Sequence, residues 1–573
     1  MSSTPQGAWR ARRRSLRLLA GVGCALAMGV VATSAQADSW HHGDGRRGAP
    51  LIPGNLLVST SDYVPAAITA GVTQLPPGCA TAPTGSCGTA VANGDDFPSV
   101  FNNSSVDAFF GIGSPVYLDE LTPWGQHIAT IPVPTDQFVT SFSSKSELAL
   151  NLSPEGNYLS FMGYDAQPGG IDVSNANTPG VLDPGNGDVG PYYRVVAQLN
   201  RWGQFTFTRT NAYSGDNGRA AITNDEHGQD LVYAAGNAGQ SKSPPAGVVA
   251  STGAQFITPS SLPETDQNPG APTPLGSFNI TQLGYSLDKA TKDNNYRAIA
   301  IHDNVVYYTK GSGGNGINTV YFVDTTGKAC PSTSATPGVG LPVPGAQLPT
   351  SPPSFTVQNF GTTSKPNDGL VPTNMCILKG FPTNLIPGTI TYPSTQSFPF
   401  GMWFANDHTL YIADEGSGDN TFANGQYANS TAAAQPSAGL EKWVFSAAAW
   451  HLAYTLQNGL DLGQPYTVPG YPTGLNTGPG GGGGPWSPAT DGLRALTGRV
   501  GRDGIATIWA VTSTVSGGGD TGADPDKLVE ISDPVNAGAP APWERFRTVR
   551  TARFGQVLRG VSFTPGTDTD SDR

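Results

Sequence analysis

The sequence predicts an all-β protein built from repeated four-stranded sheets. Residues 296–311 show the repeating unit, because two runs of alternating or β-branched residues meet at His302-Asp303-Asn304, a pattern typical of antiparallel strands joined by a tight polar turn. Similar pairs recur at residues 146–165, 218–237, 400–416 and 493–514. The 74 glycines and 49 prolines also favour short strands and turns over helices. Self-similar β units along one chain predict a β-propeller, in which sheets called blades surround a central channel.

The strands are expected in the following order. The first blade receives three strands, at residues 55–62, 116–121 and 127–134. The second is expected at 146–152, 157–165, 192–199 and 205–210, and the third at 218–223, 230–237, 247–251 and 254–259. The fourth is expected at 296–301, 304–311, 318–325 and near 354–358. The fifth is expected at 400–405, 409–416, 439–446 and 450–456, and the sixth at 493–498, 506–514, 527–533 and 546–552.

One strand, at residues 558–563, remains without a downstream partner. It matches the first strand of a blade, which is the strand that the three N-terminal strands lack. Joining them closes the ring and removes two unprotected sheet edges. The sequence therefore predicts six blades, closed by the C-terminal strand, with seven as the alternative if residues 260–295 hold a further strand set. Long segments such as 326–399 and 457–491 are expected to be surface insertions.

The N-terminal residues have the order of a secretory signal peptide. Five arginines between positions 10 and 17 precede an apolar run at 18–32 and then Ala35-Gln36-Ala37. The run is shorter than the roughly 20 residues of a spanning helix, so we expect no membrane span. Arg13-Arg14 leaves both general and twin-arginine export open. We expect a signal peptide at 1–37, a flexible leader at 38–54, one propeller domain with long loop insertions at 55–565, a disordered tail at 566–573, and a secreted or periplasmic location.

Charge and cysteine content narrow the functional classes. Without the expected signal peptide the chain has 26 basic and 43 acidic residues, a formal net charge of −17, which disfavours nucleic acid as a partner. Four cysteines then remain, and in an exported protein they predict two disulfides between nearest partners, Cys79 with Cys87 and Cys330 with Cys376. Their spacing matches no zinc site, and Asp414, Glu415 and Asp419 lack the spacing of a calcium loop, so no metal is predicted.

When the first strands of the predicted blades are aligned, one position carries a charged residue in all blades but the fifth. These residues are Glu147, Arg219, Arg297, Arg494 and Arg559, with Gly401 in the fifth blade. Innermost strands line the channel, so one interpretation is that the guanidinium groups meet at its mouth and bind a carboxylate or phosphate group. An interpretation at least as good is that these arginines bond backbone carbonyls of the adjacent blade and hold the ring together. Asp165 and Glu415 complete the set of predicted ligand-binding residues, as acids that could lie beside the arginines.

No motif fixes a reaction. The chain has no Gly-x-Ser-x-Gly elbow, no phosphate-binding loop and no dinucleotide fingerprint. Sialidases are six-bladed and use an arginine cluster, but their Asp-box signature has only one partial counterpart, at residues 502–509. Histidines 227, 302 and 408 share a place at the turn after a first strand, which explains them without catalysis. Catalytic residues, cofactor and oligomeric state are therefore left unassigned.

Several blade segments carry a resemblance to known proteins. They are residues 153–159, 163–165, 296–299, 410–414, 439–443 and 559–563. Through them the chain resembles exported, mostly uncharacterised β-propeller proteins in the style of the NHL, TolB-like and gluconolactonase-like propellers. The resemblance implies the fold rather than an activity. The resulting hypothesis is an exported module that binds an extracellular ligand or partner, anionic or carbohydrate, at the channel mouth. The alternative is a propeller hydrolase or lyase that acts on glycans or lactones.

Overall fold

The structure, a computed structural model, describes much of the chain beyond residue 49. The described residues are 50–64, 69, 71–72, 74–75, 88–89, 111–171, 173–174, 176–181, 191–226, 231–237, 253–258, 274–276, 295–311, 316–330, 338–351, 357–359, 370–372, 374–386, 395–476, 483–517 and 522–568. They belong to one compact unit, Gly45–Arg573. The expected signal peptide, Cys79, Cys87 and His227 lie outside the described residues.

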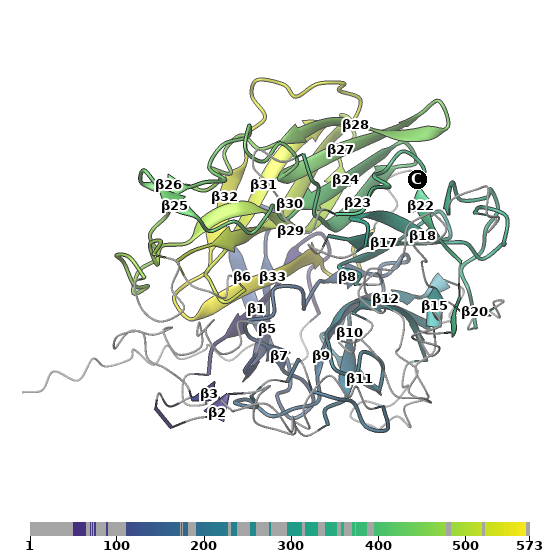
Figure 1. Cartoon of the computed structure of the whole chain (residues 1–573). Coiled ribbons are helices and arrows are strands. Elements are labelled where there is room, and N and C mark those ends of the chain that lie inside the picture. Colours follow the sequence, from purple (N-terminus) through teal and green to yellow (C-terminus); the bar gives the residue numbers. More distant parts are fainter. Residues whose placement is uncertain are drawn as a thin grey trace, which may run out of the picture. The chain divides into compact units, whose positions relative to one another are not determined.

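The described strands form a six-bladed β-propeller (Figure 1). From the innermost strand outward, blade 1 contains β33 (Gln556–Phe563), β1 (Leu56–Asp62), β5 (Val116–Leu121) and β6 (His127–Pro132). Blade 2 contains β8 (Asn151–Leu152), β9 (Tyr158–Tyr164), β10 (Arg194–Asn200) and β11 (Phe205–Thr210). Blade 3 contains β12 (Gly218–Asn224), β13 (Leu231–Gly236), β14 (Ala254–Ile257) and β15 (Pro274–Gly276).

The remaining three blades complete the ring. Blade 4 contains β16 (Ile299–His302), β17 (Val305–Lys310), β18 (Thr319–Val323), β22 (Met375–Leu378) and β19 (Val339–Gly340). Blade 5 contains β23 (Pro399–Asn406), β24 (Thr409–Asp414), β27 (Gly439–Ser446) and β28 (Ala449–Leu456). Blade 6 contains β29 (Ala489–Val500), β30 (Ile505–Val515), β31 (Lys527–Pro534) and β32 (Arg547–Thr551).

In the described part of the chain, four two-stranded sheets lie outside the blades. They pair β2 (Gln74–Leu75) with β3 (Gly88–Thr89), β4 (Gly113–Ser114) with β7 (Thr140–Ser141), β20 (Val357–Asn359) with β21 (Leu370–Pro372), and β25 (Phe422–Ala423) with β26 (Gln426–Tyr427). No helix in the described part of the chain is long and apolar enough to cross a membrane.

Apolar layers between the blades hold the ring together. Because side chains alternate along a strand, each sheet has two apolar faces, and each face packs on a neighbouring blade. Val58 and Leu558 of blade 1 pack with Trp509 of blade 6, and Leu118 packs with Phe161 of blade 2 on the other side. Further layers join blades 2 and 3, blades 3 to 5 and blades 5 and 6.

The C-terminal strand closes the ring as predicted. β33 pairs antiparallel with β1, from Leu56 opposite Phe563 to Asp62 opposite Gln556. Figure 1 shows β33, from the yellow end of the colour scale, against β1 from the purple end. All residues of β33 are buried, so it is the innermost strand of blade 1 and not a surface appendage.

Two outer strands differ from the prediction. Residues 254–257, expected as the fourth strand of blade 3, form its third strand, β14, and β15 is the fourth. The strand expected at 247–251 lies outside the described residues. In blade 4 the fourth strand is β22, whereas the expected segment near residue 357 pairs with β21 in a separate sheet. Both errors fall in long insertions, where several short apolar runs compete and periodicity does not decide which one pairs.

The predicted disulfide between Cys330 and Cys376 is confirmed, with their Cα atoms 5.8 Å apart. Cys376 lies on β22 and faces Phe322 of β18 across the sheet. The bond therefore ties the long insertion after β18 to the strand with which that insertion ends.

Candidate functional site

The six innermost strands line a channel whose two ends differ. These strands are β33, β8, β12, β16, β23 and β29. We call the end at which they begin the upstream end, and the end at which they finish the downstream end. At the downstream end the closing residues of all six strands surround a cavity of about 560 Å³. Its lining includes Asn151, Ile222, His302, Phe404, Arg499 and Phe563.

The upstream end holds the charged residues that the first-strand alignment predicted. Glu147, Arg219, Arg297, Arg494 and Arg559 are all buried there. Glu147 and Arg297 lie just before β8 and β16, since these strands begin later than predicted. The fifth-blade position is Gly401, because a Cβ atom at that position would collide with the backbone carbonyl of Arg494 in the next blade. The sixth position therefore supplies no side chain to the channel.

Arg297 differs from the other cations of this cluster because, among the described residues, it has no carboxylate partner. Its residue surface is 6% exposed. Its guanidinium donates one hydrogen bond, from Nη1 to Ser146 Oγ, and lies 5.7 Å from the centre of the Phe400 ring. No carboxylate in the described part of the chain lies within ion-pair distance of it, and its Nε has no hydrogen-bond partner there. Burial, reinforced by the charge of Arg219, lowers the pKa of Arg297 to about 9.

Glu415 and Lys145 supply the opposing charges beside Arg494. Lys145 Nζ lies 2.9 Å from Glu415 Oε2, and Arg494 Nε lies 3.4 Å from the same oxygen. Burial alone would raise the pKa of Glu415, but Lys145, Arg297 and Arg494 together hold it below its usual value. The side chain of Lys145 is 34% exposed, so it marks the side from which solvent reaches the cluster.

Glu147 is engaged by the loops around it. Its Oε2 accepts hydrogen bonds from Thr140 Oγ1 at 2.8 Å and Ser141 N at 3.0 Å. Its Oε1 accepts from Asn217 Nδ2 at 2.7 Å and from the Tyr164 hydroxyl. Burial raises the pKa of Glu147, and the four donors oppose that change. With two donors at each oxygen, this carboxylate positions loops and has no lone pair left for a ligand.

Arg219 and Arg559 bind backbone groups. Arg219 Nη1 donates to the Asn295 side chain and, at 3.0 Å, to the carbonyl of Tyr296, while Asp216 lies 3.8 Å from its Nη2. Arg559 donates to the carbonyls of Phe142, Ser144 and Gly522 and lies 3.7 Å from Asp526. Arg559 thus takes the interface role that the sequence left open, because these carbonyls belong to the segment before blade 2 and to the segment between β30 and β31 of blade 6.

Asp165 lies apart from this cluster. Its carboxylate pairs with Arg209 on the outermost strand of blade 2, at 2.8 Å. The carboxylate of Asp414, which precedes Glu415, accepts from the backbone N–H groups of Phe398 and Gly416. Asp419 accepts from the N–H of Thr421 in its own loop. The three acids considered for calcium therefore point to separate groups.

Further buried carboxyl groups lie near the cluster, and of these the sequence singled out only Asp414, as a candidate for calcium. Burial raises the pKa of Asp491 and of Asp524 to about 6, and that of Asp526 to about 7. Asp414 and Glu441 form a close pair bridged by the Ser397 hydroxyl, at 2.9 and 3.1 Å. Burial and the neighbouring carboxyl raise the pKa of Glu441 to about 8. Acids scattered over distant segments meet only in the folded ring, so no local motif reveals them.

Lys145 and Asp216 are cluster residues that sequence reasoning missed. Lys145 precedes Glu147 by two positions, and Asp216 precedes Arg219 by three. The signal was a charged residue in the loop directly before an innermost strand. That signal is weak, because turns are commonly polar whatever their role.

The cluster is suited to hold an anion. Arg219 Nε, Arg297 Nε and Arg494 Nη1 are buried donors without a hydrogen-bond partner in the described part of the chain. Buried donors of this kind are costly unless an acceptor meets them.

No protein-family model matches the chain, and no curated protein matches it significantly in sequence.

Proposed function

We propose that this protein is an exported propeller that binds a small anionic ligand at the upstream end of its channel. The ligand class is a carboxylate or phosphate compound, because guanidinium groups donate paired hydrogen bonds to these anions. The observation that carries the proposal is Arg297, a buried cation with one hydrogen bond and no ion pair among the described residues. We infer export from the signal-like N-terminal sequence. We infer the relationship to NHL, TolB-like or gluconolactonase-like propellers from the blade motifs.

The ligand is expected to be small. The arginines at the upstream end are 3–6% exposed, so only a compact group fits among them. The 34% exposed side chain of Lys145 gives the direction of approach. The pKa of Arg297, about 9, keeps this cation charged at neutral pH, so we expect anion binding to weaken as the pH rises past about 9.

A propeller enzyme acting on glycans or lactones has less support. Such an enzyme needs an acid or base within reach of the anion clamp. Glu147 already accepts four hydrogen bonds, and Glu415 is paired with Lys145 and Arg494. Both carboxylates are therefore committed to holding the cluster together.

The proposal is tested by titrating the full chain with phosphate, sulfate, citrate and galacturonate in a calorimeter. Arg297→Lys keeps the charge and removes the planar fork. Because a hydrogen bond to a charged group contributes about 1.5–3 kcal/mol, we expect at least tenfold weaker binding of the anion that binds best. The control is Arg502→Lys, since Arg502 is exposed at the downstream end. Equal affinity of Arg297→Lys and the unchanged protein, or no binding of any of the four anions, would overturn the proposal.

A further inference from the structure

Three exposed tryptophans share one position in three consecutive blades. Trp124, Trp202 and Trp543 are 69%, 49% and 56% exposed. Each lies in the segment that joins the third and fourth strands of its blade, in blades 1, 2 and 6 respectively. Successive strands of a blade alternate in direction, so the third strand finishes at the same end as the innermost one. All three tryptophans therefore lie on the downstream end of the ring, the end at which the channel cavity is lined by the closing residues of the innermost strands.

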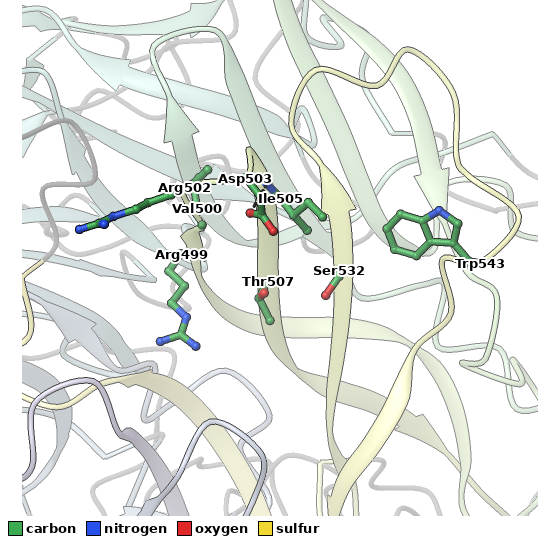
Figure 2. A pocket seen from close by; sticks show the side chains of 9 residues that line it. Arg499, Val500, Arg502, Asp503, Ile505, Thr507, Ser532 and Trp543 are labelled. Carbon is green, nitrogen blue, oxygen red and sulfur yellow. Dashed lines mark hydrogen bonds between the residues drawn. The ribbon is translucent and has the colours of Figure 1, made fainter.

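Trp543 borders a groove on the face of blade 6. Arg499 is opposite Thr507 in the pairing of β29 with β30, and Thr507 is opposite Ser532 in the pairing of β30 with β31. Direct cross-strand partners project from the same face, so these side chains form one row. Figure 2 shows this row, with Trp543 beyond Ser532 and Asp503 above Thr507. These residues line a groove of about 650 Å³.

The groove exists because the fourth strand is short. β32 pairs only with residues 527–530 of β31. Beside the remainder of β31 the chain forms the loop at residues 535–546, which carries Trp543. The loop is held in place, since Val535 N–H donates to the carbonyl of Gly504 at 3.0 Å and Phe546 N–H donates to that of Asn458 at 2.8 Å. The indole is thus presented on a fixed support.

The other two tryptophans are also on anchored turns. The carbonyl of Pro123, beside Trp124, accepts a hydrogen bond from the buried Trp509 Nε1 of blade 6 at 2.9 Å. The Arg201 guanidinium lies 4.7 Å from the Trp202 ring centre, and the carbonyl of Arg201 accepts from Leu51 N–H at 2.9 Å. Rigid aromatic side chains lose little conformational freedom when they bind, so such positions favour binding.

We propose that this downstream face binds a neutral polysaccharide, with Trp543 and its groove as the principal subsite. An indole stacks on the apolar face of a sugar ring, while hydroxyl, carboxylate and guanidinium groups bond the sugar hydroxyls at the ring edge. The groove supplies both kinds of group, in Trp543 and in Arg499, Asp503, Thr507 and Ser532. The chain is strongly acidic, with a formal net charge of −12, so a neutral chain fits better than a polyanion. This site is separate from the proposed anion site, because it shares none of the residues of the upstream cluster.

The test is native gel electrophoresis of the full chain in gels containing hydroxyethylcellulose, mixed-linkage β-glucan, galactomannan or soluble starch. We expect at least one polysaccharide to retard the protein. Trp543→Ala should then weaken binding at least tenfold, Trp543→Phe should weaken it less, and Trp124→Ala and Trp202→Ala should each have smaller effects. The matched control is Leu475→Ala, since Leu475 is 57% exposed but lies before β29, at the upstream end.

Three outcomes would overturn the proposal. They are the absence of retardation by all four polysaccharides, equal retardation of Trp543→Ala and the unchanged protein, and a loss on Leu475→Ala as large as that on Trp543→Ala. Sedimentation with phosphatidylcholine vesicles that depends on Trp543, without retardation by any polysaccharide, would assign the face to a lipid surface instead. Arg297→Lys should retain polysaccharide binding, which separates failure of this site from failure of the anion site.

Discussion

The upstream and downstream ends of the channel are formed by the same six strands but present different surfaces. At the upstream end, loops bring Lys145 and Glu415 over the strand beginnings, and the arginines beneath them are buried. At the downstream end, the connections leave a cavity open and expose three tryptophans. The strands of the ring are alike, so the difference comes from the connections. In a repeated fold, the length and composition of the loops decide which end buries charge and which end offers a surface.

The largest effect is expected from a truncation that unfolds the ring and so removes both ends of the channel at once. Truncation after Thr551 removes β33, which is buried throughout and forms the innermost strand of blade 1. Blades 1 and 6 would then lose the apolar layer that joins them, and the free edge of β1 would be exposed. We expect no cooperative thermal transition by calorimetry. A stop after Asp568 is the control, because it leaves every described contact in place. A truncated protein that unfolds at the original midpoint would contradict closure by β33.

A smaller loss of stability is expected when single arginines are replaced, and it should differ between the two ends of the channel. Arg559→Ala removes donors to three loop carbonyls and leaves the buried Asp526 without its cation, so we expect a loss of about 3–5 kcal/mol in the free energy of unfolding. Arg499→Ala, at the exposed downstream end, removes a contact with the Trp509 ring worth about 0.5–1 kcal/mol. Urea denaturation measures both. Equal losses of unfolding free energy in the two variants would contradict the difference in burial between the two ends.

The smallest expected effect is a pH dependence that belongs to the upstream end. The pKa of Glu441 is raised by burial and by Asp414 to about 8, against about 4.3 in an unfolded chain. A carboxyl with a raised pKa contributes stability that is complete below about pH 4 and is lost as the pH rises through about 8. Between pH 5 and 8 we therefore expect the unchanged protein to lose about 1–3 kcal/mol more than Glu441→Gln does.

Thermal midpoints at four or five pH values measure this difference. Glu530→Gln is a suitable control, because Glu530 pairs with Arg547 on the outer part of blade 6. Parallel profiles for Glu441→Gln and the unchanged protein would show that Glu441 titrates normally in the folded state.

The two wrong outer strands have a common cause. The third and fourth strands of blades 1, 2, 5 and 6 have five to eight residues, which is long enough for side-chain alternation to reveal them, whereas β14, β15 and β22 have only three or four. Blades 3 and 4 contain insertions of tens of residues, and the loop-closure cost differs little between alternative pairings at such lengths. A short run such as Met375-Cys376-Ile377-Leu378 becomes the fourth strand because it packs on β18, which is a contact between distant parts of the chain.

The repeating strand pairs, the six-blade ring and its closure by residues 558–563 could be predicted from the sequence, because they depend on local alternation of side chains and on the need to leave no free sheet edge. The pairing of Cys330 with Cys376 could be predicted because the two cysteines are nearest partners in the chain. The role of each aligned charge, in contrast, follows only from the folded ring. Arg559 bonds loop carbonyls, Glu147 is surrounded by donors, and Arg297 is left with a single hydrogen bond. Hydrogen-bond partners come from loops far away in sequence, so equivalent positions in the repeat acquire different chemistry.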